Sequence, residues 1–413
     1  MGFKKQPWFN EKKFGIFIHY GLYSQIERGE WTMQYEHIPY EEYQKLADTF
    51  DPSHFDADRL ARQAKDAGAG YLVLTTRHHE GFCLYDSQYS DYNSVKYVGR
   101  DLVREHVEAC RRHGLRVGLY YSLLDWRFKG YHNRAKYPES CEAMVQQVHN
   151  QVRELLTNYG QIDYLFFDGG WFEDNLMPSV PDWANKIAAV WRSKELDDMI
   201  RELQPNILTN ERSGYPGDVL TPEQKTRAAS DGRYSEACMT IGDRFGWSFI
   251  HNNPNLKTSR DILQHMMVQA GFGGNFLLNT GPLPNGDTYN YDDRILSDIG
   301  RWLRVNGEGY YGTTKPDVLP TSMLGEFTQK GNFLYHHIFR WPRNGEAAIA
   351  NVVRKVKKVT MLETGEELPF VQLPDTRVIV KGLPYLAPDM MATTLKFELS
   401  DEMLENIPDY GTL

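Results

Sequence analysis

The sequence predicts an α/β protein with a (β/α)8-like (TIM-type) barrel over residues 1–312 and a C-terminal β-sandwich domain over residues 313–413. Short apolar runs rich in β-branched and aromatic residues alternate with segments of helical periodicity, which is typical of a parallel sheet. After Gly312 the pattern changes to alternating strands separated by turns. The length of 413 residues also suits a barrel of about 250–320 residues with a smaller second domain.

Seven candidate strands can be placed in the barrel region, one fewer than a complete barrel requires. They cover residues 14–19, 71–76, 116–122, 164–168, 207–210, 238–241 and 276–279. Several of the intervening helices end at glycine, as helix C-termini often do. These helices are expected over residues 58–67, 102–113, 141–159, 185–203, 260–270 and 293–305. The irregular or missing unit is expected within residues 214–232, which have the composition of a long, functional loop.

The second domain is predicted from short segments in which side chains of opposite character alternate. These segments cover residues 332–339, 346–349, 356–362, 376–381 and 394–399. The sequence contains no internal repeat, low-complexity segment or long linker. The two domains are therefore expected to pack directly against each other.

The composition is that of an ordinary globular protein, with 41% hydrophobic and 24% charged residues. The net charge of −9 without a basic block argues against a nucleic-acid partner. No window of 18 apolar residues or apolar N-terminal stretch indicates a membrane span or signal peptide. Cys83, Cys110, Cys141 and Cys238 lack metal-ligand spacing and are expected to be reduced thiols. A cytoplasmic location without a cofactor is expected, and the sequence carries no signal of oligomeric state.

Polar residues follow five of the expected strands, at the end of a parallel barrel where active sites lie. Each one alone could be a cap or turn residue, but five in register indicate that titratable groups converge on one rim. With Glu30, these groups are suited to the hydroxyls of a sugar. The 25 Tyr and 9 Trp suit sugar stacking as well as core packing. The strand ends are His19-Tyr20-Gly21, Arg77-His78-His79-Glu80-Gly81, Tyr120-Tyr121-Ser122, Asp168-Gly169-Gly170 and Asn210-Glu211-Arg212.

Asp168 follows the apolar run Tyr164–Phe167 and precedes two glycines that would let a ligand approach the backbone. Such a carboxylate suits a fixed nucleophile, although Asp-Gly-Gly is also a common turn sequence. His78 and His79 are adjacent, so an extended backbone would point their side chains to opposite faces. This arrangement argues against a single metal held by both.

A series of motifs runs from about residue 8 to residue 312. Through these motifs the sequence resembles the glycoside hydrolase family 29 α-L-fucosidases. They are Trp8-Phe9, Lys13–Gly21, Gly29-Glu30-Trp31 with Met33, Thr75–Phe82, Gly118–Ser122, Phe166–Gly169, Thr221–Gln224, Ser235–Ile241, Gly273–Pro282 and Asn306–Glu308.

The resemblance implies a retaining exo-glycosidase that removes terminal α-L-fucosyl residues from oligosaccharides or glycoconjugates through a covalent glycosyl-enzyme intermediate, without a metal. It implies that Asp168 is the nucleophile. Glu223 is favoured as acid/base because its Thr-Pro-Glu-Gln setting, eleven residues after Arg212, resembles the position used in some members. Glu236 is the alternative acid/base, because it matches a glutamate of the family's Trp-Glu motif. The residues implied to bind fucose are His19, Glu30, His78, His79, Tyr121 and Arg212.

The sequence departs from the family pattern at several positions near the expected sugar site. Phe166 and Thr32 stand where Trp and Tyr are common, and these changes could admit a related sugar such as α-L-galactose. Tyr20 replaces Trp, and Arg77 and Glu80 replace Lys and Asp. Two other classes stay open as alternatives: a non-catalytic carbohydrate-binding protein, and a metal-dependent barrel hydrolase that uses His19, His78, His79 and Asp168.

Overall fold

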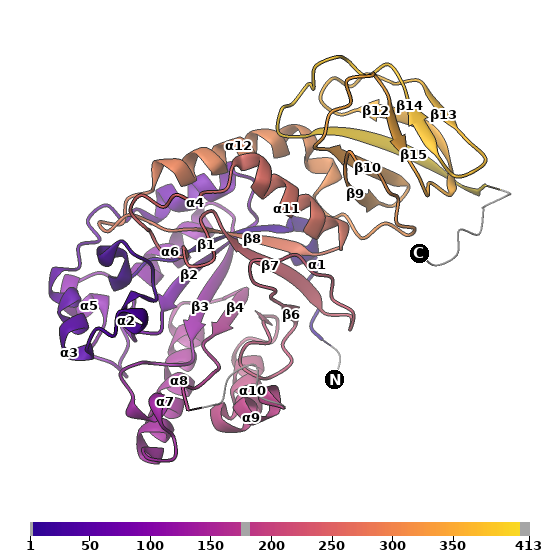
Figure 1. Cartoon of the computed structure of the whole chain (residues 1–413). Helices are drawn as coiled ribbons and strands as arrows, with labels where there is room; N and C mark the ends of the chain where they lie inside the picture. Colours follow the sequence, from indigo (N-terminus) through magenta and orange to yellow (C-terminus); the bar gives the residue numbers. More distant parts are fainter. Residues whose placement is uncertain (1–2, 175–181, 405–413) are drawn as a thin grey trace.

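The computed structural model describes residues 3–174 and 182–404, which form a barrel and a smaller sandwich that lie side by side (Figure 1). The barrel strands pair in parallel in the order β5-β4-β3-β2-β1-β8-β7-β6. A parallel bridge between Asn210 and Val219 links the edge strands, so the barrel is nearly closed. The strands are β1 Phe14–Ile18, β2 Tyr71–Arg77, β3 Arg116–Ser122, β4 Tyr164–Asp168, β5 Leu208–Thr209, β6 Val219–Leu220, β7 Tyr234–Thr240 and β8 Asn275–Thr280.

Seven long helices lie outside these strands in the described part of the chain. They are α4 Ala57–Asp66, α6 Leu102–Arg112, α8 Pro138–Asn158, α9 Trp183–Trp191, α10 Ser193–Leu203, α11 Ser259–Gly271 and α12 Asn290–Asn306. Asp56, Asp101 and Thr258 cap α4, α6 and α11 by accepting hydrogen bonds from backbone amides of the first turn. The single helix expected over residues 185–203 is instead two helices, because Arg192 between them adopts a left-handed conformation with φ 51°.

Shorter helices lie in the connecting segments. They are α1 Pro7–Lys12, α2 Thr32–Tyr35, α3 Tyr40–Tyr43, α5 Ser94–Val98 and α7 Lys129–His132, with 3₁₀ turns η1 Leu22–Ile26, η2 Gln44–Thr49 and η3 Gly307–Gly309. The irregular barrel unit lies where the sequence predicts it. Residues 214–232 contain the two-residue strand β6, and the described chain has no helix between β5 and β7.

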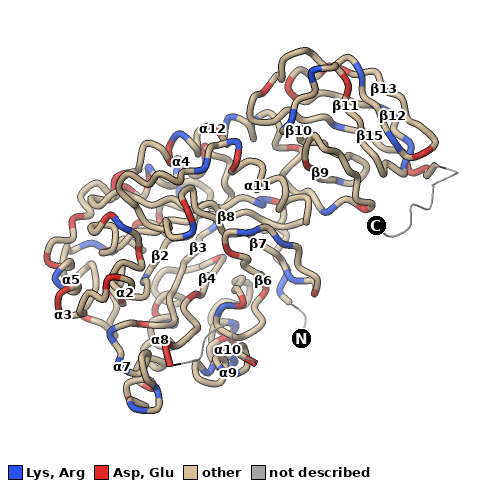
Figure 2. Tube along the Cα trace, viewed as in Figure 1, with Lys and Arg blue, Asp and Glu red and all other residues tan. Residues whose placement is uncertain are grey.

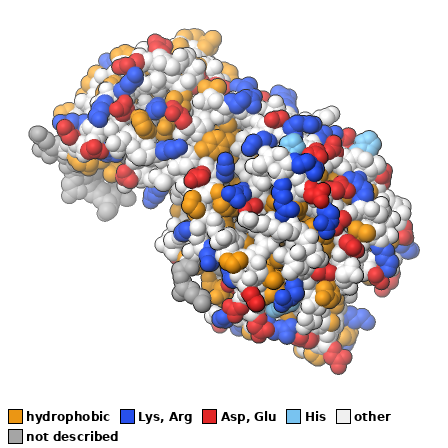
Figure 3. Space-filling model, turned by 180° about the vertical axis from the view of Figure 1, so that it is seen from behind, with side chains coloured by type: hydrophobic (Ala, Val, Ile, Leu, Met, Phe, Trp, Pro, Cys, Tyr) orange, Lys and Arg blue, Asp and Glu red, His pale blue; other side chains and the backbone are white. Residues whose placement is uncertain are grey.

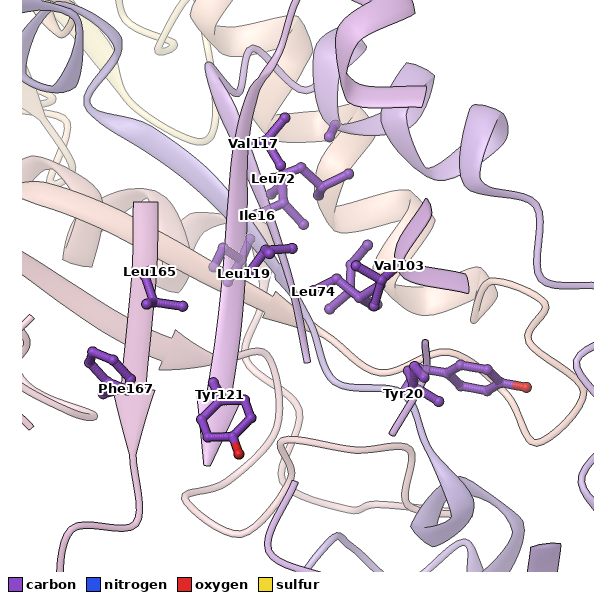
Figure 4. Close-up of a cluster of buried hydrophobic side chains, with 14 of the residues drawn as sticks. Ile16, Tyr20, Leu72, Leu74, Val103, Val117, Leu119, Tyr121, Leu165 and Phe167 are labelled. Carbon is purple, nitrogen blue, oxygen red and sulfur yellow. The ribbon is translucent and has the colours of Figure 1, made fainter. Parts of the chain in front are cut away.

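Side chains of the barrel strands alternate between two buried layers, which explains why the strands are almost continuously apolar. One layer packs against the helices and includes Val117, Leu119 and Tyr121 of β3 (Figure 4). The other fills the barrel interior and includes Tyr120 and Phe166. Which of the two alternating positions a residue occupies along its strand therefore decides whether its side chain can reach a site at the barrel mouth.

The sandwich consists of a four-stranded sheet of order β12-β15-β10-β9 and a three-stranded sheet of order β11-β14-β13. Strands β9 and β13 are not predicted from the sequence, because much of each is only half-buried and the apolar alternation is weak. The strands are β9 Gly325–Lys330, β10 Phe333–Ile338, β11 Ala347–Ile349, β12 Arg354–Met361, β13 Phe370–Gln372, β14 Val378–Val380 and β15 Thr393–Met403.

The sandwich packs directly on helices α11 and α12, as the absence of a linker predicts (Figure 1). The Trp302 indole of α12 donates a hydrogen bond of 2.8 Å to the Ala392 carbonyl. Ala392, Phe339 and Met391 belong to the same buried apolar cluster as the outer layer of the barrel. The expected boundary at residue 312 falls between η3 and β9. The sandwich has a separate apolar core of its own, but these three residues extend the barrel cluster across the boundary.

Charged residues of both signs are interspersed along the described chain (Figure 2). The face in Figure 3 likewise shows basic and acidic groups together with small apolar areas. Among the described helices, none has the length and apolar character needed to cross a bilayer.

Two buried histidines in β10 are expected to make the free energy of unfolding sensitive to acid. His336 stacks on Phe327 at 4.4 Å in the sandwich core, whereas His337 bonds Thr328 Oγ1 at 3.0 Å and faces Trp302. Burial lowers the pKa of each to about 3. Because the unfolded chain binds these protons near pH 6.5, the contribution of the two histidines to the free energy of unfolding is fully present above that pH and is lost as the pH drops toward 3.

His336→Phe tests this, since neither ring nitrogen of His336 has a hydrogen-bond partner among the described residues. Between pH 7.5 and 5, the variant is expected to lose about 2 kcal/mol less free energy of unfolding than the wild type. Denaturant titrations at both pH values measure the difference. Equal losses in the two proteins would contradict the assignment.

Candidate active site

A pocket of about 420 Å³, open to solvent, lies at the C-terminal ends of the barrel strands. It brings together six residues that the sequence analysis singles out. These are His19, Glu30, His78, Asp168, Arg212 and Glu223. The rest of the lining is mostly aromatic: Phe17, Trp31, Tyr120, Phe166, Trp171 and Trp247, with Cys238.

Asp168 ends β4 and is held by several donors. Its Oδ1 lies 2.9 Å from Arg212 Nη1, and its Oδ2 accepts a hydrogen bond of 3.0 Å from the Tyr120 hydroxyl. His79 Nε2 lies 3.8 Å from the same Oδ2. The side chain of Asp168 is 14% exposed. This carboxylate is therefore fixed in orientation and still reachable from the pocket.

The two glycines after Asp168 are required by packing rather than by a ligand. Gly169 has φ +68°, and a Cβ there would lie 2.9 Å from Leu124 Cγ. A Cβ on Gly170 would lie 2.5 Å from the backbone carbonyl oxygen of Arg212. Gly169 thus lets the chain after β4 approach Leu124, and Gly170 lets it approach the loop that carries Arg212.

Arg212 connects Asp168 to Glu223. Its Nη1 lies 2.9 Å from Asp168 Oδ1 and 2.9 Å from Glu223 Oε2. The two carboxylate oxygens therefore cannot be farther apart than these contacts laid end to end, about 5.8 Å. Thr221 orients the guanidinium, because its Oγ1 and carbonyl oxygen each accept a hydrogen bond of 3.0 Å from it.

Glu223 lies in the segment expected to be a loop, but its backbone is fixed. The Cys238 amide donates to the Pro222 carbonyl at 3.1 Å, and the Gln224 amide donates to the Cys238 carbonyl at 2.9 Å. These bonds hold Glu223 against β7 in strand-like pairing. Its side chain is 43% exposed, so it stands at the mouth of the pocket.

Three histidines lie close together at the pocket, and two of them, His19 and His78, line it. His19 Nδ1 lies 2.5 Å from Asn279 Oδ1, and His79 Nδ1 lies 2.8 Å from Ser122 Oγ. Burial lowers the pKa of both rings well below the usual value, so both are neutral. The prediction that His78 and His79 point to opposite faces is wrong. Strand β2 ends at Arg77, and the two ring centroids lie 4.0 Å apart.

Glu30 is buried beside these histidines. Its Oε2 accepts a hydrogen bond of 3.0 Å from the Ser248 amide, whereas its Oε1 has no partner among the described residues. Burial is the main cause that raises the pKa of this carboxyl to about 7. An orphaned buried oxygen on the pocket wall suits a ligand hydroxyl, which would satisfy it.

Three residues named from the sequence do not line the pocket: His79, Tyr121 and Glu236. His79 is buried and lies against Asp168, so it supports the carboxylate from outside the pocket lining. Tyr121 points toward the helices, where its hydroxyl donates to Gln151 Oε1 at 2.8 Å (Figure 4). The prediction that Tyr121 binds the sugar is therefore wrong by one residue. Its neighbour Tyr120 is the residue of β3 whose side chain points into the barrel. Glu236 is fully buried one layer deeper than Cys238, and it accepts hydrogen bonds from Tyr71 and from Tyr164, the latter at 2.9 Å. It is not among the residues that line the pocket.

A buried ionic network lies behind the histidines and accounts for Arg77, a departure from the family pattern. Arg77 donates to Tyr121, to Gln151 Oε1 at 3.1 Å and to the Leu124 carbonyl at 2.8 Å. Its charge is balanced by Asp125, which lies 3.5 Å away and also binds Arg127 at 2.6 Å. The network fixes the strand end that leads into His78 and His79.

Asp125→Ala is expected to lower the free energy of unfolding by about 3–5 kcal/mol, because it leaves the fully buried Arg77 without its counter-charge. Asp58→Ala is the control, since Asp58 pairs with Arg112 on the surface and should cost no more than about 1 kcal/mol. Chemical denaturation of both variants provides the comparison. Similar losses would mean that the buried network contributes no more than a surface pair.

Several lining residues are not among the catalytic or sugar-binding residues named from the sequence. Phe166 and Tyr120 could have been found from parity, because they alternate with Phe167 and Tyr121 along their strands. Trp171 and Trp247 lie in loops after β4 and β7, where no periodicity marks them. Within residues 3–174 and 182–404, no group of three or more His, Cys, Asp or Glu side chains could hold a metal ion.

Comparison with known proteins agrees with this geometry. The α-L-fucosidase family model matches residues 3–308. Human tissue α-L-fucosidase is 30% identical over 421 residues, which cover 92% of this chain and 85% of that protein. The structure of α-L-fucosidase isoenzyme 1 from Paenibacillus thiaminolyticus is 34% identical, with a TM-score of 0.84 and coverage of 95% of this chain and 98% of that one.

A glycoside hydrolase family 29 α-L-fucosidase from Bacteroides thetaiotaomicron, trapped as a covalent intermediate with 2-fluoro-fucosyl fluoride, is also similar. It is 26% identical, with a TM-score of 0.85 and coverage of 97% of this chain and 98% of that one. The matches extend over both the barrel and the sandwich. The chain therefore belongs to the α-L-fucosidase family, glycoside hydrolase family 29.

Proposed function

We propose that the chain is a retaining α-L-fucosidase in which Asp168 is the nucleophile and Glu223 is the acid/base catalyst. The observation that carries the proposal is the position of Arg212 between the two carboxylates, which keeps them within about 5.8 Å. Retaining glycosidases have a separation of about 5–5.5 Å, whereas inverting enzymes need about 6.5–9.5 Å to admit a water molecule. The geometry thus supports double displacement.

In the first step, an Asp168 oxygen attacks the anomeric carbon of the fucosyl residue while the bond to the leaving oxygen breaks. Glu223 transfers its proton to that oxygen, so the leaving sugar departs as an alcohol. The Tyr120 hydroxyl and Arg212 orient Asp168 for this attack. The product is a fucosyl ester of Asp168 with inverted anomeric configuration.

In the second step, Glu223 as a carboxylate removes a proton from water, and the resulting hydroxyl attacks the ester. The Asp168 carboxylate is released, and the second inversion restores the original configuration.

The ring hydroxyls of fucose would bind His19, His78, Glu30 and Arg212, while the aromatic side chains pack on its apolar face. Of the two departures that could alter sugar choice, only Phe166 lines the pocket. Thr32 instead donates a hydrogen bond of 2.7 Å to the Gly29 carbonyl, which stabilises the loop. Sugar specificity therefore depends on Phe166 more directly than on Thr32.

Hydrolysis of a panel of 4-nitrophenyl glycosides tests the proposal. The α-L-fucoside is expected to be the best substrate, and the α-L-galactoside, which adds one hydroxyl at C6, is expected to react up to about 10²-fold more slowly. β-D-Galactoside is expected to be inert. Fucose binding without hydrolysis of any fucoside would instead favour the carbohydrate-binding alternative. Loss of activity in EDTA would favour a metal-dependent hydrolase.

The natural substrate is proposed to be a fucosylated oligosaccharide processed in the cytoplasm. The support is that Cys83, Cys110, Cys141 and Cys238 are all unpaired and buried, as is usual in a reducing compartment. Subcellular fractionation of the source cells, with activity on the α-L-fucoside as the readout, tests the location. Activity recovered mainly outside the cytoplasmic fraction would refute it.

A further inference from the structure

We infer that four aromatic side chains form a binding subsite for the sugar that leaves, the residue to which the fucose is attached. We call this surface the aromatic shelf, and it consists of Trp31, Trp171, Tyr35 and Phe245. The inference rests on the proposed function, because it concerns the leaving group of the same reaction. It assigns a role to two exposed residues, Tyr35 and Phe245, that do not line the fucose pocket itself.

The shelf begins at the pocket mouth and continues outward. Trp31 and Trp171 line the pocket and stack on each other, with ring centroids 6.0 Å apart and an interplanar angle of 15°. Tyr35 lies 5.7 Å from Trp31, and Phe245 lies 6.0 Å from Tyr35. Tyr35 and Phe245 are 63% and 44% exposed. Aromatic faces of this size are therefore presented to solvent in an unbroken series from the pocket.

The backbone holds this series in place. Trp31 and Tyr35 are four residues apart around the one-turn helix α2, where the Tyr35 amide donates to the Trp31 carbonyl at 3.0 Å. Phe245 comes from the loop after β7. A hydrogen bond of 2.9 Å from the His251 amide to the Glu27 carbonyl joins this loop to the segment between β1 and α2. Gly29, at φ +102°, lets the loops meet, because a Cβ there would lie 3.1 Å from the Phe245 carbonyl oxygen.

Polar residues adjoin the shelf, as recognition of a sugar requires. Gln34, next to Tyr35 in α2, donates from Nε2 to Glu173 Oε1 at 3.2 Å. The guanidinium of Arg244 lies 4.5 Å from the centre of the Phe245 ring. A pyranose stacked on the shelf would find donors and acceptors within reach of its hydroxyls.

The position also agrees with the direction in which the leaving group must exit. Glu223, the proposed proton donor to the leaving oxygen, stands partly exposed at the same mouth as Trp31 and Trp171. A leaving sugar bonded to that oxygen lies outside the pocket and against its rim. The shelf is thus the apolar surface available to stack on this sugar.

The test compares two substrates that differ only in the leaving group. α-L-Fucosyl fluoride has no leaving sugar that could reach the shelf. Fucosyl disaccharides have one, and one disaccharide is used for each linkage to the reducing-end pyranose. For the disaccharide that the wild type cleaves best, Tyr35→Ala and Phe245→Ala are each expected to lower kcat/KM about two- to tenfold, and the double variant about tenfold or more. For the fluoride, kcat/KM is expected to stay within about twofold of the wild-type value.

Tyr35→Phe and Phe245→Tyr keep an aromatic face and are expected to retain disaccharide hydrolysis. Tyr385→Ala is the matched control, because Tyr385 is 69% exposed on the sandwich. This variant is expected to leave kcat/KM unchanged for both substrates. A double variant with an unchanged disaccharide-to-fluoride ratio would overturn the inference. If the wild type hydrolyses neither substrate, the proposed function fails instead.

Discussion

The Asp168→Asn protein is expected to fold normally and to hydrolyse 4-nitrophenyl α-L-fucoside at least about 10³-fold more slowly than the wild type. The neutral amide is a poor nucleophile and cannot form the fucosyl ester. Asparagine preserves the size of the side chain at the end of β4, so the loss should be confined to kcat. Steady-state kinetics together with circular dichroism separate the chemical loss from unfolding. A folded variant with a rate within tenfold of the wild type would exclude Asp168 as the nucleophile.

Azide rescue of Asp168→Gly supplies a stereochemical check on the same residue. Azide can enter the space left by the carboxylate and attack the anomeric carbon directly. This single displacement inverts the centre, so the expected product is β-L-fucosyl azide. Nuclear magnetic resonance of the product identifies the anomer, and recovery of the α anomer would be inconsistent with a vacated nucleophile position.

Glu223→Gln is expected to slow cleavage of a fucosyl disaccharide by about 10²–10⁴-fold, because a sugar alcohol cannot leave without proton donation. With 2,4-dinitrophenyl α-L-fucoside, whose leaving group needs no proton, formation of the ester should be much less affected. The ester should then accumulate, because water has lost its base. Mass spectrometry of the variant mixed with this substrate should detect one fucosyl group on Asp168.

Glu236→Gln is the matched control for this experiment. Glu236 is buried against Tyr71 and Tyr164, and glutamine can still accept a hydrogen bond from one of them. Its kcat/KM for both substrates is expected to stay near the wild-type value. Azide should rescue Glu223→Gln with an α-L-fucosyl azide product, since attack on the ester inverts the centre a second time. If Glu236→Gln, and not Glu223→Gln, slowed the disaccharide much more than the dinitrophenyl fucoside, Glu236 would be the acid/base catalyst instead of Glu223.

The barrel could be predicted because its strands are buried on both faces. Such strands form apolar runs that stand out from the amphipathic helices, and those from Phe14–Ile18 to Asn275–Thr280 were located in this way. Strand β6 is not predicted, because a strand of two residues is too short to show a pattern of alternating side chains. Its existence depends on the bridge of Val219 to Asn210 and on pairing with β7, which are contacts between distant parts of the chain.

The site was predictable where a side chain directly follows a strand. Asp168 and Arg212 occupy such positions, and the structure brings both to one pocket. The error at Tyr121 has a physical origin, because a shift of one residue along an extended strand exchanges the barrel interior for the helix layer. His78 and His79 fall beyond the end of β2, where the alternation of a strand no longer applies.

Loop residues were beyond the reach of local patterns. Trp247 lines the pocket because its carbonyl accepts a hydrogen bond of 2.5 Å from Asn279 Nδ2, a residue of the next strand. Phe245 joins the aromatic shelf because its loop meets the segment around Gly29. Both placements depend on tertiary contacts, so the sequence alone carries no signal for them.

The apolar contact between the sandwich and the barrel helices makes the stability of the barrel depend on the second domain. A chain cut at residue 312 would expose Trp302 and remove Phe339, Met391 and Ala392 from the cluster that supports the barrel helices. A destabilising change in the sandwich would therefore reduce the amount of active enzyme and leave the turnover of each surviving molecule unchanged. Screens that read only total activity would mistake such a change for a catalytic defect.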